Sequence, residues 1–178
     1  MTRVPRHADF RLLTGRGTGD RTSGAASASV SYMQWIETHR DVVYPWQCDH
    51  MGHLNVMYYT AMFDRATWHL FSSVGFTGAY LRTQDRGMAA VQSTTSYRSE
   101  LVSGDLIVIR SRFLEVHERK ARFEHEMTNL ETGEIAATSE LVGVHIDRTV
   151  RKACAIPEEI RSSIEKLISG ESGDSADR

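Results

Sequence analysis

The sequence has little cysteine, no long apolar run and almost no net charge, and each of these absences excludes a class of protein. Among its 178 residues are two cysteines, Cys48 and Cys154, which lie far apart and form no CxxC motif. We therefore expect no disulfide framework and a cytoplasmic location, where thiols stay reduced. No apolar run approaches the roughly 20 residues that span a bilayer, so no membrane partner is expected. The formal net charge of −2 leaves no basic excess for binding nucleic acid.

Composition divides the chain into three parts. Residues 1–32 are rich in Gly, Ser, Ala and Thr. They predict a disordered tail, because so few apolar side chains cannot offset the entropy that is lost on ordering. Residues 33–168 are expected to form one folded domain, and residues 169–178 a loose C-terminal tail. The glycine run at 15–19 looks like a phosphate-binding loop, but no strand precedes it and no helix follows, so we expect no dinucleotide site.

A long and largely buried helix is predicted at residues 54–75. Apolar side chains recur there at the spacing of one helix face, and Gly75 suits the C-terminal end. The residues of this face are Tyr59, Met62, Phe63, Ala66 and Leu70. Thr60, Asp64 and Thr67 form only a narrow polar stripe, which indicates that most of the helix surface is covered by protein.

The rest of the folded part favours strands. One strand is predicted before the helix and ends near Pro45, and four more follow Gly87, before a short helix at 157–168. In the clearest of them, Phe123, His125 and Met127 alternate with polar residues and share one face. This order of elements predicts an α+β fold, in which an antiparallel sheet of about five strands curls around one long central helix.

The stretch QCDHMGHLNVMYY, which opens the predicted helix, carries several proton-handling groups. Gly52 permits a tight bend, and Asn55 can cap the first helical turn. The free N–H of Val56 then offers a site for a developing oxyanion, since the helix dipole favours negative charge there. Asp49 can activate a water as general base or attack a carbonyl itself, and His53 can orient it or share its proton. These five residues are the candidate catalytic set.

Each of these side chains also has an ordinary structural interpretation. Asp49 can be a loop or capping residue, His53 a structural hydrogen-bonding group and Asn55 a cap alone. Four side chains of the loop are of metal-ligand types: Cys48, Asp49, His50 and His53. Their spacing matches no zinc pattern, so we expect no metal. The chain contains no G-x-S-x-G, P-loop or H-E-x-x-H motif, which leaves Asp49 as the strongest candidate for a reactive group.

The segment YPWQCDHMGHLNVMYYTAMFDRA resembles the signature of hot-dog-fold acyl-CoA thioesterases of the 4-hydroxybenzoyl-CoA thioesterase type, whose D-x-x-G loop leads into a central helix. The similarity runs from about residue 37 to 160, and includes Y-R-S-E-L-x-x-G-D at 97–105 and D-R-T-V-R-K-A-x-x-I-P at 147–157. It implies a hot-dog fold, hydrolysis of acyl-CoA thioesters without a cofactor, and a homodimer or homotetramer with its site between subunits.

The resemblance also implies roles for single residues. The catalytic aspartate of the family falls on Asp49, its bend glycine on Gly52, and the amide that polarises the thioester carbonyl on Val56. His53 is similar to the catalytic histidine of plant acyl-ACP thioesterases, but Met51 stands where that family has its catalytic asparagine. Asp49 is therefore the expected base, with His53 as its helper.

Further residues are expected to contact the substrate. In such enzymes, basic residues near the hairpin between the middle strands hold the CoA phosphates; Arg119 and Lys120 match these positions, whereas Glu118 replaces a third. Side chains after the central helix line the acyl pocket, and the expected substrate contacts on the helix and that strand are Tyr59, Gln92, Ser93 and Thr94. Arg119 and Lys120 fit a solvated turn equally well, and Gln92, Ser93 and Thr94 fit an ordinary strand equally well.

Two other functions stay open at the level of sequence. Related hot-dog hydratases and dehydratases use an Asp/His pair, but their histidine follows the aspartate by five residues, with Asn-Pro between them. Here His53 follows Asp49 by four residues, and no Asn-Pro intervenes. The other alternative is a non-catalytic module that binds acyl-CoA.

Overall fold

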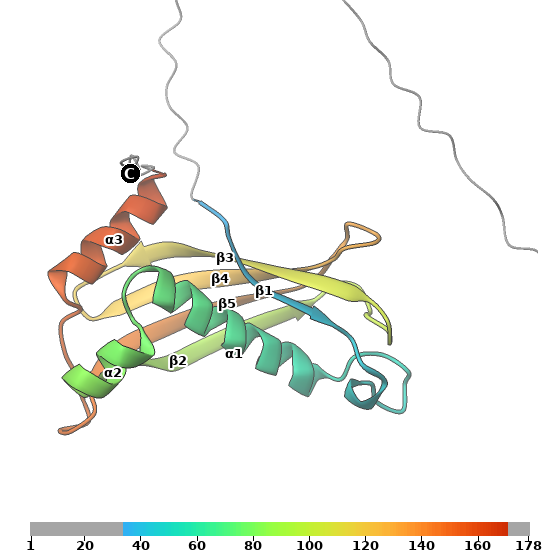
Figure 1. Cartoon of the computed structure of the whole chain (residues 1–178), viewed down its shortest axis with the longest axis horizontal. Helices are drawn as coiled ribbons and strands as arrows, with labels where there is room; N and C mark the ends of the chain where they lie inside the picture. The colour runs from blue at the N-terminus through green and yellow to red at the C-terminus, as the bar shows by residue number, and fades with distance from the viewer. Residues whose placement is uncertain (1–33, 171–178) are drawn as a thin grey trace, which may run out of the picture. The chain divides into compact units, whose positions relative to one another are not determined.

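The structure, a computed structural model that describes residues 34–170, consists of one antiparallel sheet with a long helix across one of its faces (Figure 1). The predicted disordered tail at 1–32 and most of the predicted tail at 169–178 lie outside the described residues. Within the described range, no helix is long and apolar enough to cross a membrane.

The strands follow the order β1-β3-β4-β5-β2, and every neighbouring pair is antiparallel, while the short β6 pairs with β5. Their bounds are β1 (Ile36–Val42), β2 (Arg86–Tyr97), β3 (Leu106–Val116), β4 (Lys120–Asn129), β5 (Ile135–Asp147) and β6 (Lys152–Ala153). The helices are α1 (Val56–Ser73), α2 (Gly78–Gln84) and α3 (Glu158–Ser169). The predicted α+β architecture, with an antiparallel sheet packed on one long helix, is confirmed.

The predicted apolar face of α1 is confirmed, because all five of its residues are buried at 4% exposure or less. The prediction that most of the helix surface is covered is wrong for a single copy, since only seven of its 18 residues are buried. Two clusters of buried side chains fix the helix to the sheet. The first lies around Tyr59, Met62 and Phe63, and the second around Leu70 and Phe71. The helix ends at Ser73, and Gly75 beyond it adopts a positive φ of 107°, which favours glycine.

Two further expectations need correction, and one helix was not predicted. Thr67 does not belong to a solvated stripe: it is 8% exposed, and its hydroxyl contacts the buried His125. The first strand ends at Val42, and Pro45 begins a 3₁₀ turn (Pro45–Gln47) instead of closing the strand. The helix α2 is unpredicted, because its seven residues show no apolar periodicity and its main signal is the Thr77 hydroxyl, which caps the N–H of Tyr80.

The two ends of the sheet differ in what they hold. At one end, here called the loop end, α1 begins, and the preceding loop is tied to the segment before β3 by a bond from Leu54 N–H to Leu101 O of 2.7 Å. At the opposite end, the hairpin end, β3 turns into β4, and His117 N–H donates to Lys120 O at 2.8 Å. The helix α1 runs from the loop end to the hairpin end, and β2 runs back along it (Figure 1).

Candidate active site

The loop before α1 holds the Asp49 carboxylate by both oxygens. One oxygen accepts the Met51 N–H at 2.8 Å, and the other accepts the Asn55 side-chain amide at 3.2 Å. The loop closes tightly, because Gly52 N–H donates to Asp49 O at 3.0 Å and Gly52 has a φ of 87°. A side chain other than glycine is strained at that φ, which explains why the bend uses this residue.

Asn55 links this carboxylate to the helix. Its side-chain oxygen accepts the Met57 N–H at 3.0 Å, and its backbone oxygen accepts the Tyr58 N–H at 2.9 Å. The predicted cap is therefore confirmed. The N–H of Val56, the first residue of α1, has no acceptor inside the helix, because the first N–H groups of any helix lack one. No hydrogen bond from this N–H to any other group is present among residues 34–170. A free donor thus stands at the positive end of the helix dipole, one residue from the side chain that holds Asp49.

A cavity of about 270 Å³ lies at this end of α1 and is lined by His53, Val56 and Tyr59, together with residues 97–100. The His53 ring is partly exposed, and its Nε2 lies 3.5 Å from a Glu100 carboxylate oxygen. Burial raises the pKa of Tyr59 to about 12, so this phenol stays protonated at neutral pH. Asp49 does not line this cavity and is connected to it through Asn55 and the helix terminus.

The structure places Arg98 and Glu100 in this cavity, and neither was singled out from the sequence. They belong to the Y-R-S-E-L stretch that carried the family resemblance, so the signal was present. Among residues 34–170, no group of three or more His, Cys, Asp or Glu side chains could hold a metal ion. His50, beside Asp49, is exposed to solvent.

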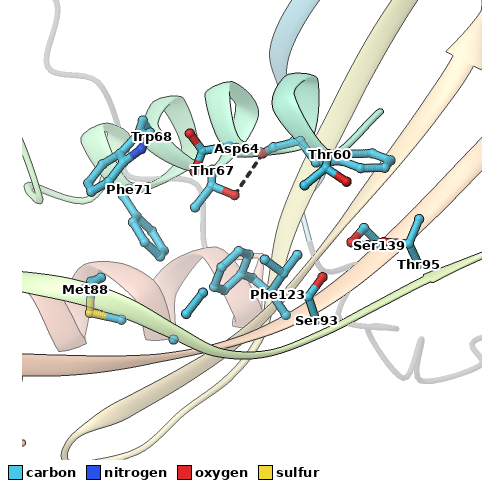
Figure 2. Close-up of a pocket in the computed structure, with 14 residues that line it drawn as sticks. Thr60, Asp64, Thr67, Trp68, Phe71, Met88, Ser93, Thr95, Phe123 and Ser139 are labelled. Atoms are coloured by element: carbon cyan, nitrogen blue, oxygen red, sulfur yellow. Dashed lines mark hydrogen bonds between the residues drawn. The ribbon is translucent and has the colours of Figure 1, made fainter. Parts of the chain in front are cut away.

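A second cavity, of about 240 Å³, lies between α1 and the sheet (Figure 2). Helix, aromatic and small strand residues surround it: Thr60, Phe63, Asp64, Thr67, Trp68, Phe71, Met88, Ala90, Ser93, Thr95, Phe123, Ser139, Leu141 and Gly143. The two cavities are neighbours, since Tyr97 lines the first and Thr95, two residues before it on the same face of β2, lines the second.

A bulge in β2 decides which of its side chains face this second cavity. The register with β5 shifts between Ala90 and Gln92, so that Ala90 and Ser93 both stand on the helix side. Of the three strand residues expected to contact substrate, Ser93 therefore lines the cavity, whereas Gln92 and Thr94 project from the opposite face. The bulge has no signature in the sequence, which is why the three could not be distinguished there.

Arg119 lies in the turn at the hairpin end and Lys120 begins β4 there, so both are at the opposite end of the sheet from Asp49. Both are exposed, and the Arg119 guanidinium pairs with Glu118 at 3.2 Å. Within one chain, the structure therefore does not bring these basic residues together with the loop that holds Asp49.

Comparison with known proteins gives a family and a fold. Residues 43–164 match the model of the thioesterase-like superfamily. An L-carnitine dehydrogenase/betainyl-CoA thioesterase of Agrobacterium fabrum is 25% identical over 125 residues, which are 70% of this chain and 25% of that protein. The chain thus spans about a quarter of the length of this relative.

Solved structures of similar shape include thioesterases. A hypothetical protein from Staphylococcus aureus, in complex with CoA, is 19% identical with a TM-score of 0.72, over 83% of this chain and 91% of that one. A 1,4-dihydroxy-2-naphthoyl-CoA thioesterase from Synechocystis is 17% identical with a TM-score of 0.65, over 74% of this chain and 96% of that one. These likenesses confirm the predicted hot-dog fold.

Proposed function

Because the chain belongs to the thioesterase-like superfamily, we propose that it hydrolyses acyl-CoA thioesters, with Asp49 as its reactive carboxylate. The observation that carries this proposal is the link through Asn55. One amide side chain binds the Asp49 carboxylate at 3.2 Å and also caps the helix whose first N–H, that of Val56, is free. The Asp49 carboxylate and the N–H that would donate a hydrogen bond to the oxyanion are thereby held in a fixed relation, as acyl transfer requires.

In the proposed reaction, the thioester oxygen accepts the Val56 N–H, and the helix dipole stabilises the negative charge that develops on it. A water oxygen attacks the carbonyl carbon while Asp49 takes the water proton. The C–S bond then breaks, and CoA leaves as the thiolate. Direct attack by Asp49, followed by hydrolysis of the anhydride, uses the same geometry and gives the same products.

The other residues of the candidate set have supporting roles in this proposal. His53 and Tyr59 line the cavity beside Val56, where the neutral Tyr59 phenol and the His53 ring can bound the thioester. Gly52 provides the bend that turns Asp49 toward Asn55. No cofactor or metal is invoked in any step.

We further propose that the protein is a homodimer formed through β2. This strand is twelve residues long, has only β5 as a neighbour among the described strands, and exposes Val91 and Tyr97 at 63% and 50%. A long exposed edge strand of this kind invites pairing with another strand. If two β2 strands pair antiparallel about a two-fold axis, the loop end of one copy stands beside the hairpin end of the other. Arg119 of the partner subunit would then lie at the end of the sheet that holds Asp49, where it could bind CoA phosphates.

The proposal is tested with Asp49→Asn and a panel of CoA thioesters, by measuring release of free thiol. We expect kcat to fall by about 10²–10⁴-fold, the usual effect of losing a positioned base. His50→Ala is the matched control, because it changes the adjacent exposed side chain of the same loop. Thermal unfolding of both variants shows whether the fold is retained.

Three results would contradict the proposal. A well-folded Asp49→Asn variant with wild-type turnover would exclude the assigned role of this carboxylate. Tight binding of CoA esters by the wild type without thiol release would indicate a binding module. Loss of conjugated absorbance from a 2-enoyl-CoA, again without thiol release, would indicate a hydratase.

A further inference from the structure

The cavity between α1 and the sheet contains one carboxylate and no other charged group. Of the fourteen residues that line it, Asp64 alone carries a charge, and the others are aromatic, aliphatic or hydroxyl side chains (Figure 2). Within residues 34–170, no hydrogen bond or ion pair engages the Asp64 side chain, which is exposed in a single copy of the chain. The negative charge is therefore available to a ligand in the cavity.

Aromatic rings stand beside this carboxylate. Trp68 follows Asp64 by one helical turn, so the two side chains are neighbours on the same face of α1. The Phe71 ring lies 6.1 Å from the Trp68 ring at an interplanar angle of 87°, and Phe123 lies 5.0 Å from Phe71 at 71°. Because the rings are set at such angles, their faces point in different directions. The face of an aromatic ring attracts a cation, so these rings can contact one.

Most hydroxyl groups of the cavity wall are already engaged by protein, with Ser93 as the exception among the lining residues. The Thr67 hydroxyl bonds to Phe63 O and to His125, both at 2.9 Å, and Thr95 and Ser139 bond to each other at 3.0 Å. A primary ammonium has three N–H donors and would find only the Asp64 carboxylate and the Ser93 hydroxyl as unengaged acceptors among the lining residues. A quaternary ammonium donates no hydrogen bond, and needs only a counter-charge and apolar surface.

The distance from the proposed reaction centre suits an acyl chain of a few carbons. Asp64 follows Val56 by eight residues, which is about 12 Å along a helix axis, with Thr60 of the same cavity between them. Helical side chains lean toward the N-terminus, so the Asp64 carboxylate approaches Val56 more closely than its backbone does. A thioester whose carbonyl meets the Val56 N–H can therefore place a terminal cation beside Asp64.

We infer that this cavity selects acyl-CoA substrates whose acyl group ends in a quaternary ammonium, with Asp64 as the counter-charge and Trp68 and Phe71 as the aromatic contacts. The inference rests on the proposed thioesterase function and names its substrate class. Asp64 is a specificity-determining residue in this scheme and takes no part in breaking the thioester bond.

The test compares two CoA thioesters of the same size and shape. One carries a trimethylammoniobutanoyl group, and the other is its neutral isostere, in which a tert-butyl group replaces the trimethylammonium. Release of free thiol gives kcat/KM for each. We expect the wild type to prefer the cationic ester by about tenfold or more, the usual effect of a close counter-charge together with a cation–π contact.

Two variants separate charge from shape. Asp64→Asn keeps the size of the side chain and should remove most of the preference for the cationic ester. The value of kcat/KM for the neutral ester should change by less than about twofold, because that ester forms no ion pair with Asp64. Trp68→Leu should reduce the preference by about two- to fivefold. Glu159→Gln, on the exposed first turn of α3, removes the same charge far from the cavity and should leave the preference unchanged.

Each other outcome overturns the inference in a recognisable way. If the wild type hydrolyses both esters equally, or only unsubstituted acyl-CoA esters, the cavity does not recognise a cation, although the thioesterase function stands. If Asp64→Asn slows both esters alike, Asp64 acts in the chemistry and not in selection. If no CoA thioester of any kind is hydrolysed, the proposed function fails, and the inference fails with it.

Discussion

His125 provides a test of how the buried polar network contributes to stability. Its ring is fully buried between α1 and the sheet, with Nε2 at 2.9 Å from the Thr67 hydroxyl and Nδ1 at 2.6 Å from that of Ser111, which in turn lies 2.6 Å from Thr38. Phe63 stacks on the ring at 5.6 Å between centroids. Burial lowers the pKa of His125 to about 3, because its hydrogen-bond partners are hydroxyls, which do not compensate a positive charge as a carboxylate would.

The sign of the pH dependence follows from that shift. As the pH falls from about 6.5, the unfolded chain gains a proton at His125, whereas the folded chain stays neutral until about pH 3. The unfolded state therefore binds more protons, and acid favours it. The slope approaches about 1.4 kcal/mol per pH unit below pH 6, and the integrated loss amounts to about 2.3 kcal/mol between pH 6.5 and 4.5.

The perturbation is His125→Asn, which keeps a polar side chain but cannot titrate. Its free energy of unfolding, measured in urea at fixed protein concentration and at several pH values, is compared with that of the wild type. At pH 7 we expect the variant to be less stable by about 1–3 kcal/mol, because the network is broken. On acidification from pH 7 to 4.5, the difference should shrink by about 2.5 kcal/mol.

The comparison isolates His125 from other groups. Burial also lowers the pKa values of His39 and His145, so both destabilise the folded state on acidification, but they do so equally in both proteins and cancel in the difference. The window stops at pH 4.5 because carboxylates with lowered pKa values, such as Glu115, begin to contribute below it. Parallel stability curves for the two proteins would refute the reasoning.

Two further predictions concern the loop and the edge strand. Asn55→Ala removes both the cap of α1 and the amide that binds Asp49. It should lower the free energy of unfolding in urea by about 1 kcal/mol and also lower kcat in the thiol assay. An unchanged kcat would show that the link to Asp49 does not matter for turnover. Val91→Lys places a charge on the exposed edge of β2 and should shift the protein from dimer to monomer in analytical ultracentrifugation. A wild type that sediments as a monomer would already exclude the β2 interface.

The helix and the strands could be predicted because their periodicity reflects burial. The residues of the α1 face repeat at helical spacing since they meet the sheet, and Phe123, His125 and Met127 alternate in β4 since that face meets α1. Asn55 was identifiable as a cap from its position before an apolar run. In each case, the sequence signal and the physical cause are local to one element.

The features that escaped prediction depend on two elements at once. The role of Thr67 depends on His125, which is 58 residues away in the chain. The cavity around Asp64 depends on the bulge near Val91, which turns Ser93 toward the helix. Along the sequence, Asp64 looks like any polar residue on the solvated side of a helix. Its position over a cavity becomes visible only when β2 and β5 are placed beside α1.

The helix α1 thus divides into a buried face that fixes it and a less covered face that is free for function. Leu70 and Phe71 anchor its second half in the cluster that includes Phe113 and Phe123. The other face carries Asp64 and Trp68, and Trp68 is 41% exposed. An indole left this open on a single copy loses stabilisation that burial would provide. Such exposure is explained if a ligand covers this face, and a copy paired along the adjacent β2 edge would enclose it further. In the proposed scheme, the residues of α1 that select the substrate are therefore those that its own sheet leaves uncovered.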